Sequence, residues 1–436
     1  MNNPRELIMH ILYDIEYNEA YSNMALKCAF SKNKDIKQID KAFITSLVYG
    51  IVARKYTLDY IISQNSKIKL KKISKYILII LRMGIYQLKY MDKVPESAAV
   101  NESVKLAKRY GHSASAGFVN GVLRSVIRND VLKPKDKYEK IAYEYSYPVN
   151  LCEKWCNDFG EEFTLKLLDS MNNPAPMSIR VNTLKITPDE LISEDNFKKS
   201  ELYENALLSD GFDVAENEFY KKGYIYPQDI SAMFASIVLN PEKGERVLDI
   251  CAAPGGKTTH IAQLMQNCGE IVACDVHEHK IGLIEKNAQR LGIDIIKTKL
   301  ADAVEFNSEF NKAFDKVLCD VPCSGYGIIR RKPDIKWKDA DNSQIIKTAK
   351  EILTNASKYV KIGGELVFST CTLNKEENEL RLKEFLNEND NFEVIDFSTL
   401  LPDKLRHNTL KDGYVTFYPH IDGIDGFFIA KIKRCR

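Results

Sequence analysis

The N-terminal part of the chain carries apolar side chains at helical spacing. Such residues recur every three or four positions over 7–15, 43–51 and 77–88. Pro95 suits the first turn of a further helix, and Gly111 suits its end. Since no segment here reads as a strand, the pattern predicts a bundle of five to seven helices.

From about residue 240 the pattern changes to short apolar runs that alternate with helical stretches. The expected strands are "RVLDI", "IVACD", "KVLCD", "GELVFST" and "GFFIAKIKR", and the longest expected helix covers 341–360. Continuous apolar strands alternating with helices are typical of a parallel sheet covered on both faces. Ligands of such Rossmann-like α/β sheets bind beyond the carboxyl ends of the strands.

The middle of the chain mixes both patterns. Residues 131–150 are polar and tyrosine-rich, with two prolines, and are interpreted as a linker. "MSIRVNTLKI" predicts a strand, and "GYIYPQDISAMFASIVL" predicts a short strand followed by a helix. We therefore predict three parts: an all-α domain over 1–135, a linker and small α/β subdomain over 136–238, and an α/β domain over 239–436.

Composition narrows the class of protein. An apolar content of 44% and a charged content of 28% describe an ordinary globular chain. No apolar run is long enough for a transmembrane helix, and the acidic N-terminus is unlike a signal peptide, so we expect a cytoplasmic protein without membrane association. The ten scattered cysteines and seven histidines form no disulfide framework and no metal-ligand spacing, so no metal is expected.

Charge is unevenly distributed along the chain. Residues 1–140 hold 25 Lys and Arg against 13 Asp and Glu, a net charge of +12, whereas the remainder has a net charge of −10. A basic domain joined to an acidic one favours contact of the first with a polyanion such as nucleic acid. A lysine-rich solvated surface is the alternative.

A small-residue loop follows the first expected strand of the C-terminal domain. Its residues are Cys251, Ala252, Ala253, Pro254, Gly255, Gly256 and Lys257. Neither the dinucleotide fingerprint nor the P-loop pattern is present. Asp275 ends the next strand, where a carboxylate accepts hydrogen bonds from ribose hydroxyls, and Asp302 could reach an adenine. The set fits S-adenosylmethionine, and a structural turn with capping aspartates is the alternative.

Two cysteines stand just past strand ends, on the same predicted rim. Cys323 follows Asp320 and Pro322, and Cys371 follows "GELVFST". A single cysteine there is usually a packed residue, but two suit methylation at C5 of a pyrimidine. A thiolate that adds to C6 makes C5 nucleophilic, and Asp320 could hydrogen-bond to the ring. A methylase of an exocyclic amine needs no thiol.

Four segments together resemble the RNA cytosine-C5 methyltransferase family over roughly 170–436. They are "DICAAPGGKT", "DVPCSGYGIIRRKPDIKW", "STCTLNKEENE" and "DGIDGFFIAKIK". The resemblance implies that Cys371 is the nucleophile and that Cys323 assists product release. It also implies S-adenosylmethionine binding by the 251–257 loop, Asp275, Asp302 and Asp320. Val321 departs from the alanine commoner at its position in the family.

The N-terminal helices resemble the NusB antiterminator fold, an RNA-binding domain, and the middle segment resembles the family's small RNA-binding subdomain. The combination is similar to the RsmB-like methyltransferases, which implies a monomer acting on one cytosine of 16S ribosomal RNA before subunit assembly is complete. The same chemistry on tRNA or another RNA, and a non-catalytic RNA-binding assembly factor, are the alternatives.

Further RNA contacts are expected from basic and amide side chains. The candidates are Arg330, Arg331, Lys332, Lys336, Trp337, Arg180 and Asn182. A basic loop with an aromatic beside a catalytic rim suits phosphate contact and base stacking. A solvated loop with Trp337 packed beneath it is the alternative. Lys257 either orients the donor or target, or simply begins a helix.

Overall fold

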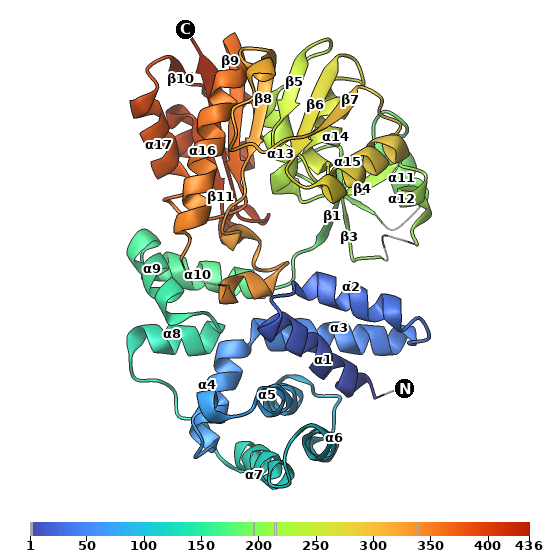
Figure 1. Ribbon diagram of the computed structural model, residues 1–436, viewed down its shortest axis with the longest axis vertical. Helices are drawn as coiled ribbons and strands as arrows, with labels where there is room; N and C mark the ends of the chain where they lie inside the picture. The colour runs from blue at the N-terminus through green and yellow to red at the C-terminus, as the bar shows by residue number, and fades with distance from the viewer. Residues whose placement is uncertain (1–2, 195–196, 213, 215, 339–340) are drawn as a thin grey trace. The chain divides into compact units, whose positions relative to one another are not determined.

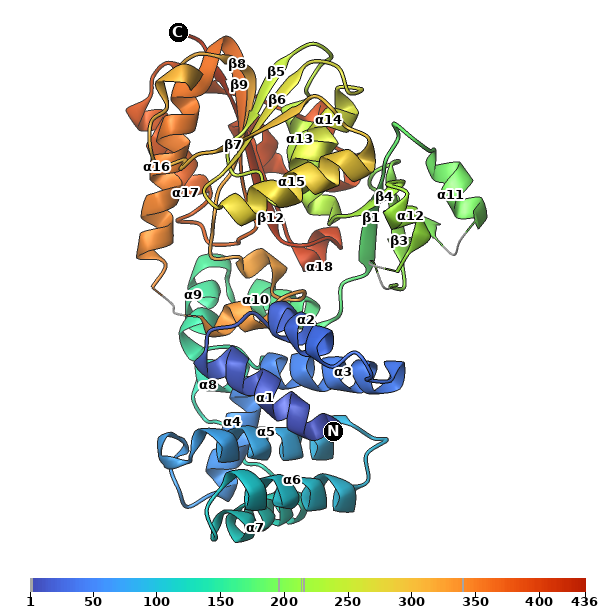
Figure 2. The same cartoon turned by 45° about the vertical axis from the view of Figure 1, so that its right-hand side comes forward.

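The computed structural model describes residues 3–194, 197–212, 214, 216–338 and 341–436. Its chain divides into two compact units (Figures 1 and 2). The first unit comprises Met1–Asn173 together with Ile329–Lys338, and the second comprises Pro174–Ile328 together with Asp339–Arg436. Each unit is described by itself below.

The first unit is helical, as the apolar spacing predicts. Its α-helices are α1 (Pro4–Tyr17), α2 (Ser22–Lys32), α3 (Gln38–Ala53), α4 (Lys55–Asn65), α5 (Lys75–Tyr90), α6 (Glu96–Tyr110), α7 (Ser115–Arg128), α8 (Lys137–Tyr145), α9 (Val149–Phe159) and α10 (Glu161–Asn172). Short 3₁₀ helices η1 (Leu70–Lys72) and η4 (Pro333–Trp337) complete it. At the start of α1 the Asn3 side chain accepts a hydrogen bond from Arg5 N–H, and Pro4 occupies the first turn.

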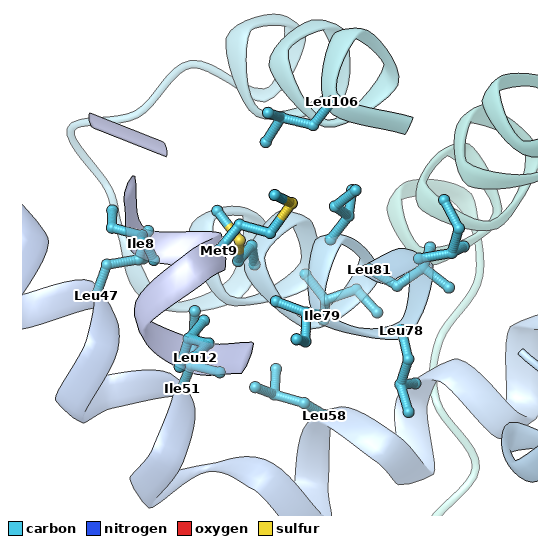
Figure 3. Packing of buried hydrophobic residues seen from close by; sticks show 14 of the residues in the cluster. Ile8, Met9, Leu12, Leu47, Ile51, Leu58, Leu78, Ile79, Leu81 and Leu106 are labelled. Carbon is cyan, nitrogen blue, oxygen red and sulfur yellow. The ribbon is translucent and has the colours of Figure 1, made fainter. Parts of the chain in front are cut away.

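One apolar core joins the helices of the first unit. Ile8, Met9 and Leu12 of α1 lie among Leu47 and Ile51 of α3 and further aliphatic residues of α4, α5 and α6 (Figure 3). Each fully buried side chain of this kind contributes roughly 1.5–3 kcal/mol of transfer free energy. The core is therefore large enough to hold the bundle together.

The interpretation of 131–150 as a linker is wrong in part, because α8 lies within it. Asp136 accepts hydrogen bonds from the backbone N–H groups of Tyr138 and Glu139, and Ile141 and Ala142 are buried. An acidic N-cap before an apolar pair was the sequence signal for this short helix.

The second unit contains two sheets. The smaller has the order β2-β3-β1-β4 and is antiparallel. Its strands are β1 (Met177–Val181), β2 (Lys198–Lys199), β3 (Ala206–Ser209) and β4 (Ile225–Pro227). Helices α11 (Pro188–Glu194) and α12 (Glu218–Lys221) accompany them. This is the predicted α/β subdomain.

The larger sheet has eight strands in the order β10-β12-β9-β8-β5-β6-β7, with β11 paired to β12. The strands are β5 (Arg246–Asp249), β6 (Glu270–Asp275), β7 (Ile296–Leu300), β8 (Phe314–Asp320), β9 (Val360–Thr370), β10 (Phe392–Val394), β11 (Tyr414–Phe417) and β12 (Phe427–Arg434). Pairs among β5–β9 are parallel, as predicted, whereas β10, β11 and β12 are antiparallel and make the sheet mixed. The strand order reverses between β5 and β8, the place where ligands bind in such sheets.

Helices cover both faces of the larger sheet. They are α13 (Ile230–Leu239), α14 (Gly256–Leu264), α15 (Glu278–Leu291), α16 (Ser343–Tyr359) and α17 (Glu379–Glu388), with α18 (Pro419–Asp422) near the chain end. Short 3₁₀ segments are η2 (Ser308–Phe310), η3 (Tyr326–Ile328), η5 (Ser398–Leu400), η6 (Asp403–Leu405) and η7 (Asn408–Asp412). Leu248 packs with α16 and α17, and its neighbour Val247 packs with α13, α14 and α15, as expected for alternating strand residues.

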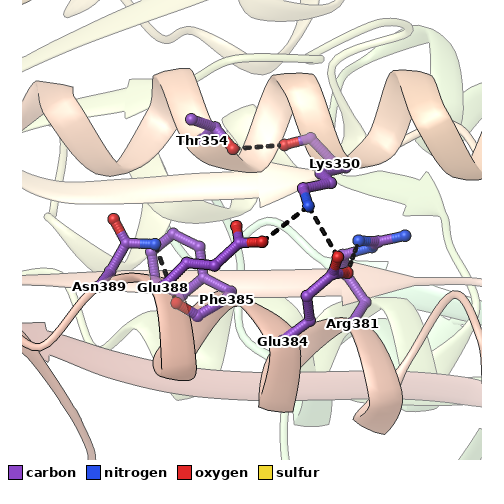
Figure 4. A network of polar contacts seen from close by, with 7 residues as sticks. All are labelled: Lys350, Thr354, Arg381, Glu384, Phe385, Glu388 and Asn389. Atoms are coloured by element: carbon purple, nitrogen blue, oxygen red, sulfur yellow. Dashed lines mark hydrogen bonds and ion pairs between the residues drawn. The ribbon is translucent and has the colours of Figure 1, made fainter.

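An ion-pair network joins the two helices on one face. Lys350 Nζ of α16 lies 2.7 Å from Glu384 Oε1 and 2.9 Å from Glu388 Oε1 of α17 (Figure 4). These groups are partly exposed, so each pair contributes at most about 1 kcal/mol. The network aligns the helices behind β8 and β9, whose far ends carry the predicted chemistry.

Candidate active site

Four parallel strands end in the polar residues of the site. Asp249 ends β5, Asp275 ends β6, Asp320 ends β8, and Thr370 ends β9 immediately before Cys371. Because the carboxyl ends of parallel strands share one edge of a sheet, residues far apart in sequence meet on one rim. This is the rim on which the sequence predicts both thiols and the donor loop.

The two thiols are adjacent. Cys323 Sγ lies 3.2 Å from Cys371 Sγ, and both residues are partly exposed. Gly327 N–H donates to the Cys371 carbonyl oxygen at 2.9 Å, which joins the two loops through the backbone. A Cβ atom at Gly327 would lie 2.0 Å from the Gly426 carbonyl oxygen, so only glycine fits there. The geometry allows both sulfurs to reach one small ring.

An ion pair lies beside the thiols. Lys257 Nζ is 2.7 Å from Asp320 Oδ2, and Ser369 Oγ donates to Asp320 Oδ1 at 2.7 Å. Burial lowers the pKa of Lys257, but the Asp320 charge and hydrogen bond outweigh it and the pKa is raised overall. Lys257 therefore stays an ammonium. The alternative, in which Lys257 only begins a helix, does not account for its ion pair with Asp320.

The surroundings of Cys323 favour the protonated form of its thiol. The hydrogen bond to Cys371, burial and the charges of Cys371, Glu377 and Asp320 raise the pKa of Cys323 well above its ordinary value. Cys323 thus holds its proton while a charge resides on Cys371. One sulfur is suited to act as the nucleophile and the other as a proton-bearing neighbour.

The predicted donor loop, 251–257, connects β5 to α14. Ala252 N–H donates to the Cys274 carbonyl at 2.8 Å, and Gly255 N–H donates to the Ala252 carbonyl at 2.8 Å. Gly255 has φ +98° and directly precedes the first turn of α14. Such a tight turn brings backbone N–H groups close to a ligand without a side chain in the way.

Three carboxylates lie at or just beyond the carboxyl ends of β5, β6 and β7, and they differ in exposure. Asp275 is 8% exposed and accepts a hydrogen bond from His277 N–H at 3.0 Å, whereas Asp302 is exposed and accepts one from Val304 N–H at 2.9 Å. Asp249 is buried, which raises its pKa to about 7, and its Oδ1 lacks a hydrogen-bond partner. Sequence reasoning missed Asp249, although an acid that ends the apolar run "RVLD" was the available signal.

These residues fit S-adenosylmethionine. Small residues line the turn, a carboxylate ends β6 where a ribose would lie, and a buried carboxylate oxygen remains unpartnered. Among the described residues, no group of three or more His, Cys, Asp or Glu side chains could hold a metal ion. Within the same ranges, no helix combines the length and apolarity that crossing a membrane requires.

Arg180 and Asn182 are buried and hydrogen-bonded within the protein, and their predicted RNA contact stays a prediction. Arg180 is 1% exposed and donates to Gln228 Oε1, to the Gly256 carbonyl and to Thr259 Oγ1. Asn182 Nδ2 donates to the Leu291 carbonyl at 2.8 Å, near the end of α15. Carbonyls at a helix C-terminus lack intrahelical partners, so Asn182 satisfies one of them. Both residues therefore join the small sheet to helices that cover the larger sheet.

Lys336 and Trp337 are hydrogen-bonded within the helical unit, and their predicted RNA contact stays a prediction. Lys336 Nζ donates to the Ala53 carbonyl at 2.9 Å, and Trp337 Nε1 donates to the Val52 carbonyl at 2.6 Å. These carbonyls end α3, so the segment 329–338 caps that helix. Burial lowers the pKa of Lys336 well below its ordinary value. The alternative, a packed Trp337, is the one the structure supports.

The other three basic candidates for RNA contact are more exposed than Lys336. Arg330 and Arg331 are partly exposed, and Lys332 is exposed. They precede η4 in the segment that belongs to the helical unit. Their predicted RNA contact remains a prediction.

Comparisons with known proteins identify the family. Family models match 2–128 (NusB family), 147–218 (RsmF/B-like ferredoxin-like domain) and 236–433 (16S rRNA methyltransferase RsmB/F). The probable ribosomal RNA small subunit methyltransferase B of Bacillus subtilis (strain 168) is 37% identical over 99% of this chain and 98% of its own. The corresponding protein of Synechocystis sp. (strain ATCC 27184 / PCC 6803 / Kazusa) is 35% identical over the whole of both chains.

Solved structures agree with this result. The crystal structure of PH0851 is 28% identical, covers both chains completely and superposes with a TM-score of 0.84. NSun6 from Pyrococcus horikoshii, solved with SFG, is 25% identical, has a TM-score of 0.60 and covers 67% of this chain and all of its own. The predicted family and fold class are thereby confirmed. The chain belongs to the RsmB/F family of 16S rRNA methyltransferases.

Proposed function

We propose that the chain methylates C5 of a cytosine in 16S ribosomal RNA, with S-adenosylmethionine as the methyl donor. Family membership supports the RNA substrate, and the NSun6 structure with SFG, an analogue of S-adenosylmethionine, supports the donor. The single observation that carries the chemistry is the 3.2 Å separation of the Cys323 and Cys371 sulfurs. A methylase of an exocyclic amine has no use for this pair.

Cys371 is the proposed nucleophile. Its thiolate adds to C6 of the cytosine, and the electron pair of the C5=C6 bond becomes available at C5. S-adenosylmethionine, when bound, supplies an electrophilic methyl group. A C5–CH₃ bond then forms as the S–CH₃ bond of the donor breaks, and S-adenosylhomocysteine is the leaving group. The base is left bonded to the enzyme through sulfur.

Asp320 and Lys257 form the polar wall of the proposed base site. The carboxylate oxygens of Asp320, which pair with Lys257, can accept hydrogen bonds from the cytosine amino group. Donation from a protonated Asp320 to N3 is the alternative. The positive charge of Lys257 also stabilises electron density that develops on the ring as sulfur adds.

Release needs two further events. A base must remove the proton from C5, and the C6–S bond must break so that its electron pair returns to Cys371. Cys323 lies close enough to assist, because its sulfur is within hydrogen-bond distance of the departing sulfur. The charge on Cys371 that raises the Cys323 pKa is consumed in the adduct, so Cys323 becomes more acidic at that stage.

We propose that the basic N-terminal part docks the RNA. Residues 1–140 carry a net charge of +12, which suits a phosphate backbone and makes affinity fall with salt concentration. The target base must leave its stack to reach the thiols. We further propose that the protein acts as a cytoplasmic monomer on RNA whose assembly into the subunit is incomplete.

Substitution of each thiol tests the chemistry. With small-subunit RNA and labelled donor, Cys371→Ala is expected to abolish methyl transfer. Cys323→Ala is expected to accumulate a protein–RNA adduct that survives denaturing electrophoresis and forms only with S-adenosylmethionine. Cys268→Ala, which removes an exposed thiol of the same unit, is the matched control. Retained turnover by Cys371→Ala would refute the proposal.

The RNA target needs a separate measurement. Bisulfite sequencing of ribosomal and transfer RNA from a strain that lacks the protein is expected to show loss of one C5-methylcytosine in the small-subunit RNA. Loss confined to tRNA would transfer the same chemistry to that substrate. A full set of modified cytosines in both RNAs would favour the non-catalytic assembly factor.

A further inference from the structure

A buried carboxylate lies behind the two thiol loops. Glu377 is 1% exposed, and its Oε2 accepts the Ser324 backbone N–H at 2.8 Å. Its Oε1 accepts the Ser324 hydroxyl at 2.6 Å and Asn374 Nδ2 at 2.9 Å. Within the described residues no Lys or Arg forms an ion pair with Glu377. Its charge is therefore held by hydrogen bonds alone, an arrangement that is costly unless the geometry is well kept.

The hydrogen bonds run from one thiol loop to the other. Ser324 directly follows Cys323, and Thr372 directly follows Cys371. Ser324 Oγ lies 2.6 Å from Thr372 Oγ1. Since the Ser324 hydroxyl donates to Glu377, the Thr372 hydroxyl is the donor to Ser324. Thr372 Oγ1 in turn accepts Asn374 N–H at 3.3 Å, which gives a chain with one direction.

We propose that Glu377 is a positioning residue that holds the loop of Cys323 in register with the loop of Cys371, so that both sulfurs face the same target base. This inference rests on the proposed function and deepens it. The carboxylate fixes the residue after Cys323 at two atoms, and that residue is bonded to the one after Cys371. A neutral or shorter side chain at this position lets the two loops separate.

The charge of Glu377 also affects which sulfur keeps its proton. Charged or titratable groups face the site from several elements: Cys371 after β9, Glu377 in the turn beyond it, Asp320 at the end of β8, and Lys257 in α14. The first three raise the pKa of Cys323. Removing the Glu377 charge lowers it, and the alkaline range in which Cys323 loses its proton then begins at lower pH.

Glu377→Gln is the principal test, because it keeps the shape and removes the charge. We expect a single-turnover rate of adduct formation about a hundredfold below that of the parent enzyme, the scale of a misplacement near 1 Å. The alkaline limb of the rate–pH profile should move to lower pH, which a merely structural role would not cause. Donor affinity in calorimetry should stay within twofold.

Two further variants make the result decisive. Glu376→Gln is the matched control, since it neutralises the exposed neighbour in the same turn and should leave rate and pH profile unchanged. Ser324→Ala removes only the hydroxyl link and is expected to slow adduct formation about tenfold, so it decides the question if Glu377→Gln does not fold. The inference is overturned if folded Glu377→Gln shows the parent rate and an unshifted pH profile. If Glu377→Gln does not fold, the same result in Ser324→Ala overturns it. The two failures can be told apart: if the proposed function is wrong, Cys371→Ala keeps its turnover, whereas failure of the Glu377 inference alone leaves Cys371→Ala inactive.

Discussion

Arg180 offers a direct test between a structural role and RNA contact. Its guanidinium donates three hydrogen bonds, reaches the first residue of α14 at the Gly256 carbonyl, and lies 5.1 Å from the ring centroid of Tyr226. Burial lowers its pKa to about 10, and within the part of the chain that the structure describes no carboxylate forms an ion pair with it. Arg180→Met keeps much of the volume and removes all three donors. We expect a less stable protein with weaker donor binding.

The magnitude follows from the contacts. Hydrogen bonds from a charged donor contribute about 1.5–3 kcal/mol each, so three set an upper bound of roughly 9 kcal/mol. The buried, unpaired charge costs several kcal/mol that methionine does not incur, which leaves a net loss on the order of 3 kcal/mol. For a unit of this size the unfolding midpoint should fall by roughly 6–12 °C. Loosening of Gly256 should weaken S-adenosylmethionine binding about tenfold, or roughly 1.4 kcal/mol.

Differential scanning calorimetry and isothermal titration calorimetry measure both effects. Lys185→Met is the matched control, since it removes an exposed cation that donates to the Arg290 carbonyl at 2.9 Å. That variant should change the free energy of unfolding by no more than about 1 kcal/mol. The reasoning is refuted if Arg180→Met melts and binds donor like the parent while RNA affinity and its salt dependence decrease.

Two other substitutions test contacts made with backbone carbonyl groups. Gly327→Ala would place a methyl group 2.0 Å from the Gly426 carbonyl oxygen, so methyl transfer should be lost while donor affinity changes only a few-fold; full activity would show that the two thiol loops can move apart freely. Trp337→Phe leaves the Val52 carbonyl without its donor and should destabilise the helical unit by about 1 kcal/mol in urea unfolding, whereas an unchanged midpoint at equal slope would contradict the capping role.

Periodicity predicted the elements that carry the site, because each of them has a strong local signal. Apolar strands that end in Asp249, Asp275 and Asp320 are short and continuous, and parallel pairing alone brings their ends to one edge. The helices of the first unit likewise follow from three-to-four spacing. The antiparallel direction of β12 lacked such a signal, since a strand reads the same in either direction.

The RNA-contact residues were harder to predict, and the reason is chemical. A phosphate oxygen and an unsatisfied helix-terminal carbonyl are both acceptors, and both attract lysine, arginine and amide donors. Lys336 caps α3 and Asn182 caps α15, so each donates to a carbonyl at a helix end within the protein. Distinguishing the two requires knowing which helix ends nearby, and that depends on tertiary structure.

The position of Glu377 likewise could not be predicted from the sequence. "STCTLNKEENE" contains three glutamates, and the sequence offers no means of choosing the one that is buried. The choice depends on the loop of Cys323, where the partner residue Ser324 is 53 residues away from Glu377 in the chain. A residue that acts through a second loop is identified only when both loops are placed.

The segment 329–338 belongs to a different unit from the residues that precede and follow it in the chain. It belongs to the helical unit, yet it begins two residues after Gly327, whose N–H is bonded to the Cys371 carbonyl. The predicted boundaries at 135 and 238 remain predictions. Boundaries that divide the chain into consecutive pieces cannot describe a segment that belongs to the helical unit but follows residues of the other unit. Because the segment caps α3 through Val52 and Ala53, removal of the N-terminal helices would leave the Lys336 ammonium and the Trp337 indole without these hydrogen-bond acceptors. A truncation at residue 135 would therefore also remove the hydrogen-bond partners of a segment that lies far along the chain.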